Sequence, residues 1–203
     1  MNAEPERFCS KCGAPAEMRR LENDHVDRCV CTRCGFVRYQ GPQLLVLTAV
    51  FAEGRMLMMR RGQDPYAGML SVPGGYVEAH ESLEAAAVRE IEEEVGLVLD
   101  RATLIPFGML SLPSMNQVHV VFIAKIEKRL PLRPSPPEVL EAGWYERSEV
   151  PEHELWTPAH DFDIDLIFDR GSSDRFDFYQ RTDESMRMIS EGTRIRHIWP
   201  AQD

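Results

Sequence analysis

The chain lacks any hydrophobic run long enough to cross a bilayer. Its longest apolar run, LLVLTAVFA at residues 44–52, is about half the length that a membrane-spanning helix needs. The opening residues MNAEPERFCSK contain no apolar signal core. Basic clusters are also lacking, because 23 Lys and Arg face 33 Asp and Glu, and the net charge is -10. This balance argues against nonspecific binding to nucleic acid or anionic membranes. We therefore expect a cytoplasmic protein with neither a membrane nor a nucleic-acid partner.

Cysteine is scarce and does not suit a disulfide framework. The chain has five cysteines, and four of them form two pairs, Cys9-x2-Cys12 and Cys31-x2-Cys34. Two such pairs at this separation are typical of a four-cysteine structural Zn²⁺ site. A redox dithiol or a catalytic zinc is less favoured, because four thiolates leave no open coordination position. Cys29 is the odd cysteine; it competes with Cys31 for the metal, and its role stays open.

The order of elements along the chain predicts a mixed α/β protein. All cysteines precede Gly41-Pro42, so we divide the chain into a ribbon module (1–42), a main domain (43–170) and a C-terminal extension of undefined structure and role (171–203). Apolar and turn patterns predict strands at 43–52, 55–60, 102–112, 117–126, 141–147 and 175–180. Capping signals predict helices that begin at Ser82 and stop at Gly96, and at 158–169 and 184–191.

The most unusual stretch is GGYVEAHESLEAAAVREIEEEVGL, residues 74–97. On a helix, Glu90, Glu93 and Glu94 fall within an arc of roughly 100°. Like charges at this spacing repel, and Arg89 alone does not neutralise three of them. Convergent carboxylates suit hard ions such as Mg²⁺ or Mn²⁺. The alternative is a solvated acidic helix face.

The wider pattern decides between these interpretations. From Gly75 the chain spells G-x5-E-x7-R-E-U-x-E-E-x-G-U, with U aliphatic, and every defined position is filled. Residues 43–170 therefore resemble the Nudix hydrolases, and the ribbon that leads through YQGP resembles the zinc-ribbon branch of that family. The resemblance implies an α/β/α sandwich with a mixed sheet behind a small zinc ribbon, and a homodimer. It also implies hydrolysis of nucleoside diphosphates linked to a further group.

The resemblance also implies roles for the residues of this pattern. The catalytic Mg²⁺ or Mn²⁺ would be bound by Gly75, Glu90, Glu93 and Glu94. One of these glutamates or a more distant one would serve as the base. Arg89 would orient Glu90, and Glu81 would brace Arg89 or reach a metal through water.

Substrate cues lie outside the pattern. Pro113 stands where the resemblance puts the proline of ADP-ribose pyrophosphatases, although a strand terminator is an equal alternative. The element SQPWPFPxS of NADH pyrophosphatases is absent, so NADH and NAD-capped RNA rank below ADP-ribose and FAD, which would release AMP.

Four further residues are candidates for the substrate site. Arg60 or Arg61 would contact phosphate or nucleotide, or else form a surface ion pair, and Glu138 or Glu141 would add a metal ligand or base. Two alternatives for the function remain. The first is a dinucleoside polyphosphate or nucleoside triphosphate pyrophosphohydrolase, and the second is a noncatalytic nucleotide sensor that binds through its ribbon.

Overall fold

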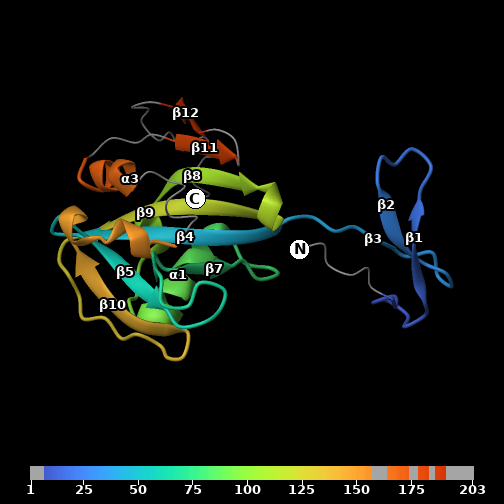
Figure 1. Ribbon diagram of the computed structural model, residues 1–203, viewed down its shortest axis with the longest axis horizontal. Helices are drawn as coiled ribbons and strands as arrows, with labels where there is room; N and C mark the ends of the chain where they lie inside the picture. Colours follow the sequence, from blue (N-terminus) through green and yellow to red (C-terminus); the bar gives the residue numbers. More distant parts are fainter. Residues whose placement is uncertain (1–6, 157–163, 174–177, 183–185, 191–203) are drawn as a thin grey trace, which may run out of the picture. The chain divides into compact units, whose positions relative to one another are not determined.

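The computed structural model describes residues 7–156, 164–173, 178–182 and 186–190 (Figure 1). The chain forms two compact units, one ending at Pro42 and the other beginning at Gln43. No helix within the described ranges is long and apolar enough to span a membrane. The functional division of the chain at 42 and 170 stays a prediction.

The first unit is a small antiparallel sheet in the order β1-β2-β3, formed by β1 (Ala16–Arg20), β2 (Asp27–Cys31) and β3 (Val37–Arg38). A tight turn holds each cysteine pair. Gly13 N–H donates to Cys9 O at 2.8 Å, and Gly35 N–H donates to Cys31 O at 3.2 Å. Both glycines have φ near +70°, which residues with a Cβ rarely adopt, so a glycine after each pair lets the chain reverse.

The second unit is built on a mixed sheet. Its central strand β4 (Gln43–Ala52) runs parallel to β9 (Gln117–Ile126) and antiparallel to β5 (Arg55–Arg61). The main order is β10-β5-β4-β9-β8-β11-β12, with β8 (Leu104–Leu112), β10 (Val139–Tyr145), β11 (Phe178–Thr182) and β12 (Met186–Ser190). The predicted strands at 43–52, 55–60 and 117–126 are confirmed.

Helices cover both faces of this sheet. Helix α1 (Leu83–Val95) buries Ala86, Ala87, Ile91 and Val95 against one face. Helix α3 (Ile164–Gly171) buries Ile164, Ile167 and Phe168 in a separate core on the other. Figure 1 shows the two helices on opposite sides of β4 and β9. The short 3₁₀ helices are η1 (Arg101–Thr103), η2 (Pro113–Met115), η3 (Arg147–Glu149) and η4 (Glu152–Glu154). The expected α/β/α sandwich behind a ribbon is therefore confirmed.

The central strands diverge beyond their hairpin turn. β4 and β5 pair at Phe51↔Met56 and Ala52↔Arg55. Further from the turn, β5 pairs with β6 (Leu70–Ser71) and β4 pairs with β7 (Gly74–Tyr76). The segment that leads into α1 is thus inserted between two strands that would otherwise be neighbours.

One predicted element near the C-terminus is wrong. Within the helix expected at 184–191, the described residues 186–190 form strand β12 instead, which pairs antiparallel with β11, while β11 pairs in parallel with β8. A segment of about eight residues is too short for a stable isolated helix, and the free edge of β11 supplies backbone partners that only the folded sheet provides. Two other expected elements lie partly outside the described residues: the helix at 158–169 over residues 158–163, and the strand at 175–180 over residues 175–177. The described part of that helix belongs to α3, which ends at Gly171.

Candidate active site and zinc centre

The four paired cysteines form a compact sulfur cluster in the ribbon. The Sγ atoms of Cys9, Cys12, Cys31 and Cys34 all lie within 4.8 Å of one another. A tetrahedral Zn²⁺ with Zn–S bonds of about 2.3 Å requires sulfurs about 3.8 Å apart. The Cys9–Cys34 and Cys12–Cys31 sulfur pairs, at 3.8 and 3.5 Å, are close to this separation. Cys29 is buried but is not part of the cluster, so the ambiguity between Cys29 and Cys31 is resolved in favour of Cys31.

Backbone hydrogen bonds favour the thiolate form of two of these cysteines, Cys12 and Cys31, by lowering their pKa values. Lys11 N–H and Arg33 N–H point at the sulfurs of Cys9 and Cys31, both at 3.4 Å. The Ala14 amide, assisted by Arg33, lowers the pKa of the Cys12 thiol to about 6. The thiolate is the form that binds zinc, so the residues present fit the ion.

Helix α1 has well-defined ends. Ser82 Oγ accepts a hydrogen bond from Ala85 N–H at 3.1 Å, and Gly96 ends the helix with φ +67°. Two amides from a later loop bond to the last turn of the helix. Arg133 N–H donates to Val95 O at 2.7 Å, and Ser135 N–H donates to Glu94 O at 3.0 Å. The 130–138 loop therefore satisfies carbonyls that a helix end leaves unpaired.

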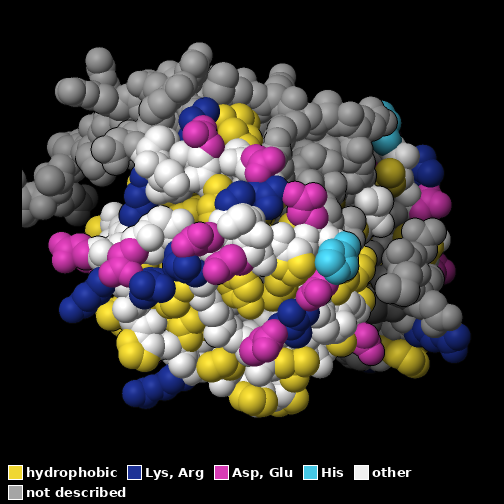
Figure 2. Space-filling model, turned by 60° about the vertical axis from the view of Figure 1, so that its left-hand side comes forward, with side chains coloured by type: hydrophobic (Ala, Val, Ile, Leu, Met, Phe, Trp, Pro, Cys, Tyr) yellow, Lys and Arg dark blue, Asp and Glu magenta, His cyan; other side chains and the backbone are white. Residues whose placement is uncertain are grey.

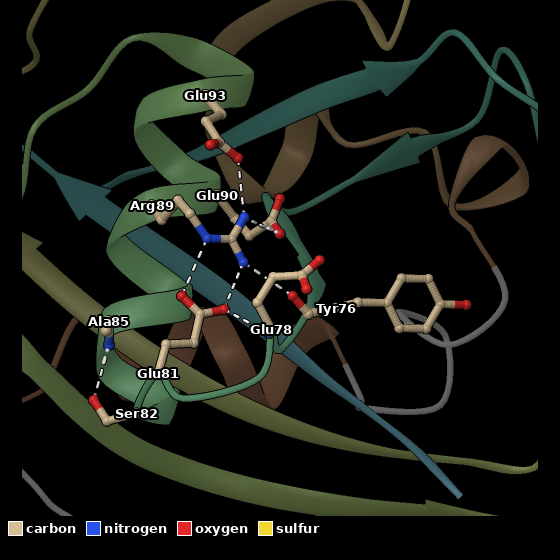
Figure 3. Close-up of polar contacts among 8 residues, drawn as sticks. All are labelled: Tyr76, Glu78, Glu81, Ser82, Ala85, Arg89, Glu90 and Glu93. Atoms are coloured by element: carbon tan, nitrogen blue, oxygen red, sulfur yellow. Dashed lines mark hydrogen bonds and ion pairs between the residues drawn. The ribbon is translucent and has the colours of Figure 1, made fainter. Parts of the chain in front are cut away.

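Arg89 is the centre of the acidic helix (Figure 3). Its guanidinium donates to Glu81 at 2.7 and 3.2 Å, to Glu90 at 2.7 Å and to Glu93 at 2.9 Å. It also donates to the Tyr76 carbonyl at 3.0 Å. One arginine thus contacts three carboxylates, of which Glu90 and Glu93 belong to the three glutamates considered in the sequence analysis. Hydrogen bonds from Arg89 lower the pKa of Glu81, and Glu81 in turn raises the pKa of Arg89.

Glu94 lies apart from this network. It is 4% exposed, and its Oε2 accepts a hydrogen bond from Gly74 N–H at 2.8 Å. Burial raises its pKa to about 8, and burial also raises the pKa of Glu90. A divalent cation would restore the charge of such carboxylates, and their oxygens suit Mg²⁺ or Mn²⁺. Among the described residues only the cysteines already form a cluster of three or more ligands, so the glutamates would have to rearrange to share an ion.

Gly75 leaves room for Glu90. A Cβ at this position would lie 2.5 Å from Glu90 Cδ and 2.6 Å from its Oε1, far inside contact distance. The main chain therefore approaches the carboxylate in a way that only glycine permits.

A cavity of about 320 Å³ opens where β4 and β5 diverge. Four of the predicted site residues line it: Arg61, Gly75, Glu94 and Glu138. Tyr66, Tyr76, Met115, Gln117 and Trp156 are among the other lining residues. Carboxylates, a guanidinium and aromatic rings thus face one space, a combination typical of sites for charged, partly aromatic ligands.

The structure separates the paired candidates. Arg60 points away from the cavity and forms ion pairs with Glu141 at 2.5 Å and Glu154 at 2.8 Å. Arg61 lines the cavity, with its Cζ 5.3 Å from the centre of the Trp156 ring. Pro113 begins η2 directly after β8 and does not line the cavity.

Glu138 is held at the cavity by its backbone. Its carbonyl accepts a hydrogen bond from Gly62 N–H at 2.7 Å, and a Cβ on Gly62 would meet Pro137 O at 1.9 Å. The charge of Glu138 contributes to the raised pKa values of Glu90 and Glu94. The loop that binds the end of α1 therefore brings a further carboxylate toward those of the helix.

Two polar residues of this region were missed from sequence. Gln117 lines the cavity, and His119 is fully buried, with its Nε2 2.8 Å from Gln117 Oε1. Burial lowers the pKa of His119 to about 4. The alternation in QVHVVF places Gln117, His119 and Val121 on one face of β9. Two polar side chains on a core face are the signal that would have pointed to them.

The α/β/α sandwich and the acidic helix agree with the resemblance noted in the sequence, and comparisons with known proteins identify the family. A family model described as NUDIX domain matches residues 42–165, and one described as Nudix N-terminal, a zinc ribbon, matches residues 7–40. The chain belongs to the Nudix family. Enzymes of this family use divalent metal ions, and the four-cysteine cluster of the ribbon supports a structural zinc.

Several relatives carry more specific names. NAD-capped RNA hydrolase NudC of Pseudomonas aeruginosa is 30% identical over 151 residues, which is 73% of this chain and 51% of that protein. An ADP-ribose pyrophosphatase of Methanocaldococcus jannaschii is 35% identical over 89 residues, covering 43% of this chain and 52% of that protein. The chain thus spans about half the length of these relatives. A NUDIX hydrolase structure from Nitrosomonas europaea has a TM-score of 0.79 at 27% identity and covers 87% of this chain and 98% of its own.

We predict that Gly75→Ala abolishes most of the activity while the fold survives. The new Cβ, 2.5 Å from Glu90 Cδ, displaces the end of a flexible side chain and separates it from Arg89. Diphosphate hydrolysis should fall on the order of 100-fold with little change in Tm. Gly41→Ala is the control, since its Cβ meets nothing within 4 Å. Full activity in Gly75→Ala would show that the Glu90 position is unimportant.

We predict that His119 makes the protein less stable in acid. Its pKa falls from 6.5 to about 4, so below pH 6.5 the unfolded chain takes up a proton that the folded protein does not accept until about pH 4. The neutral, buried His119 therefore contributes its full stability above pH 6.5. As the pH falls from 6.5 to about 4, the free energy of unfolding should decrease by roughly 3 kcal/mol in total. Urea titrations at several pH values compare wild type with His119→Gln and with His153→Gln, whose imidazole is exposed. Equal acid sensitivity in all three proteins would contradict the prediction.

Proposed function

We propose that the protein hydrolyses the diphosphate bond of ADP-ribose or FAD and releases AMP. The observation that carries this proposal is the cavity where Glu94, Glu138, Gly75 and Arg61 meet aromatic side chains. The charged groups suit a diphosphate with its metal ions, and the aromatic groups suit the organic parts of such a substrate. Nothing in this arrangement calls for a covalent nucleophile.

Each charged residue has a proposed task. Glu90, Glu93, Glu94 and the backbone of Gly75 would bind Mg²⁺ or Mn²⁺, which when bound supplies the charge that stabilises the leaving phosphate. Arg89 holds the Glu90 carboxylate in place, and Glu81 holds Arg89. Arg61 is the preferred phosphate contact, because it lines the cavity while Arg60 is engaged by Glu141 and Glu154.

Glu138 is the preferred base. It lines the cavity, and its backbone is fixed by the Gly62 amide, whereas Glu141 is paired with Arg60 outside. Its carboxylate would take a proton from the water that attacks phosphorus as the anhydride P–O bond breaks. ADP-ribose would thus yield AMP and ribose 5-phosphate. Pro113 directly follows β8 and begins η2, the segment that places Met115 in the cavity lining. It would therefore influence substrate binding only indirectly, through the position of η2.

A second candidate substrate class is NADH and NAD-capped RNA. The name of the Pseudomonas aeruginosa relative, which aligns with 73% of this chain, supports it. The net charge of -10 opposes nonspecific nucleic-acid binding but does not exclude an RNA-linked diphosphate. Figure 2 shows basic and acidic side chains interspersed over one face of the molecule.

We propose that the ribbon supports folding or assembly of a cytoplasmic homodimer and takes no part in the chemistry. Its four sulfurs would occupy all four positions of a tetrahedral Zn²⁺. A noncatalytic sensor is disfavoured because every residue of the acidic pattern is present. Hydrolysis of nucleoside triphosphates or dinucleoside polyphosphates by the same residues is tested together with the leading substrates.

We predict that product analysis with Mg²⁺ yields AMP and ribose 5-phosphate from ADP-ribose. The panel also contains FAD, NADH, NAD-capped RNA, a dinucleoside polyphosphate and an oxidised nucleoside triphosphate. Glu93→Gln should lose activity on the order of 100-fold through loss of a metal ligand. Glu92→Gln, an exposed neighbour outside the pattern, should stay active. If NADH or NAD-capped RNA is the preferred substrate, the proposal of ADP-ribose or FAD is wrong and the second substrate class is correct. If no substrate is hydrolysed, the result favours a noncatalytic nucleotide sensor.

A further inference from the structure

Two polar side chains on β9 link the cavity to the protein interior. Gln117 lines the cavity, whereas His119 is 0% exposed and has no contact with solvent. The His119 ring stacks on Trp156, with ring centres 6.0 Å apart and planes at 23°. Burying an imidazole costs free energy unless its hydrogen bonds are made, so the one bond that His119 does make is informative.

That bond fixes the tautomer of His119. Nε2 lies 2.8 Å from Gln117 Oε1, while Nδ1 has no hydrogen-bond partner among the described residues. A proton on Nδ1 would leave a buried N–H donor without an acceptor, which folded proteins rarely tolerate. A proton on Nε2 is donated to the amide oxygen instead. The imidazole is therefore neutral, with its hydrogen on Nε2.

The tautomer in turn fixes the Gln117 amide. With Oε1 accepting from His119, the NH₂ group points the other way, and Nε2 lies 3.2 Å from Tyr76 Oη. The NH₂ group has two hydrogens, and Tyr76 takes one of them. The other has no acceptor among the residues that the structure describes, so Gln117, which lines the cavity, can donate it to a ligand there and cannot turn to become an acceptor.

The surroundings of this donor suit a neutral part of a ligand. The charged groups of the cavity interact with one another, since Arg61 lowers and Glu138 raises the pKa of Glu94. Gln117 instead bonds to two uncharged rings, His119 and Tyr76. Phosphate oxygens are best held by cations, whereas a neutral amide matches a ring nitrogen or a carbonyl oxygen.

We propose that Gln117 determines substrate specificity by donating a hydrogen bond to an acceptor atom, a ring nitrogen or carbonyl oxygen, on the group beyond the diphosphate. His119 is a positioning residue, which acts only by holding the Gln117 amide in this orientation. The inference rests on the proposed function, because it concerns the substrate of the same cavity.

Steady-state kinetics of the full chain test this inference, using the substrate that wild type hydrolyses best. Gln117→Met keeps the length of the side chain and removes the donor, and His119→Phe keeps the ring on Trp156 and removes the bond to Gln117. Each should raise KM about tenfold and leave kcat within about threefold, since the lost bond is remote from the reacting atoms. His119→Gln, which retains an N–H donor, should restore KM. Gln43→Met is the matched control, since Gln43 lies opposite Gln117 in the sheet and outside the cavity lining.

The double variant distinguishes positioning from structural support. If His119 acts only through Gln117, then Gln117→Met combined with His119→Phe should have the KM of Gln117→Met alone. Additive effects in the double variant, or an unchanged KM in Gln117→Met, would overturn the inference. Should His119→Phe fail to fold, the KM of Gln117→Met and of His119→Gln still decides.

A binding measurement separates this inference from the proposed function. Calorimetry with ADP-ribose uses Glu93→Gln as the parent protein, with and without Gln117→Met. Weaker binding in the double variant supports the specificity role even if wild type shows no turnover. Normal turnover by wild type together with equal binding in both variants leaves the function standing and refutes the role of Gln117.

Discussion

The contacts of a single guanidinium allow helix α1 to hold so many carboxylates. Arg89 bonds to Glu81, Glu90 and Glu93, and it also bonds to the carbonyl of Tyr76 on the strand that precedes the helix. Without this cation the glutamates would repel one another along the helix. Glu94 is stabilised separately, by the Gly74 amide in a buried position. The carboxylates of the acidic pattern therefore lie in two environments, one hydrogen-bonded to Arg89 and one buried away from water.

The divergence of β4 and β5 places these environments beside a cavity. Strand β7 fills the gap on the β4 side, and through Tyr76 it contacts both Arg89 and Gln117, one by its carbonyl and the other by its phenol. Figure 3 shows the Tyr76 ring extending away from Arg89. The 130–138 loop closes the other side by bonding to the last carbonyls of α1 and carrying Glu138. Helix position, loop position and cavity shape are thus coupled through backbone hydrogen bonds.

Local signals in the sequence predicted much of this architecture. Helix α1 was predicted from its capping residues Ser82 and Gly96, and strands β4 and β9 from the hydrophobic runs 43–52 and 117–126. These signals were sufficient because each element depends mainly on residues that are neighbours in the chain. The choice between Arg60 and Arg61 depended on strand pairing, since Glu141 lies opposite Arg60 across β5 and β10. Strand β12 forms by pairing with the edge of β11, and the buried Glu94 carboxylate is hydrogen-bonded by the Gly74 amide. These features arise from contacts between distant segments, which no local pattern contains.

We expect that Arg89 orders the carboxylates for a divalent metal and does not merely compete with it. Calorimetric titration of zinc-loaded protein with Mn²⁺ tests this directly in Arg89→Lys, which keeps the charge and loses the forked geometry. Arg55→Lys is the matched control, because Arg55 also binds two glutamates. The affinity for Mn²⁺ should be at least about tenfold lower in Arg89→Lys than in wild type, and it should be unchanged in Arg55→Lys. Equal or tighter Mn²⁺ binding in Arg89→Lys would contradict this expectation.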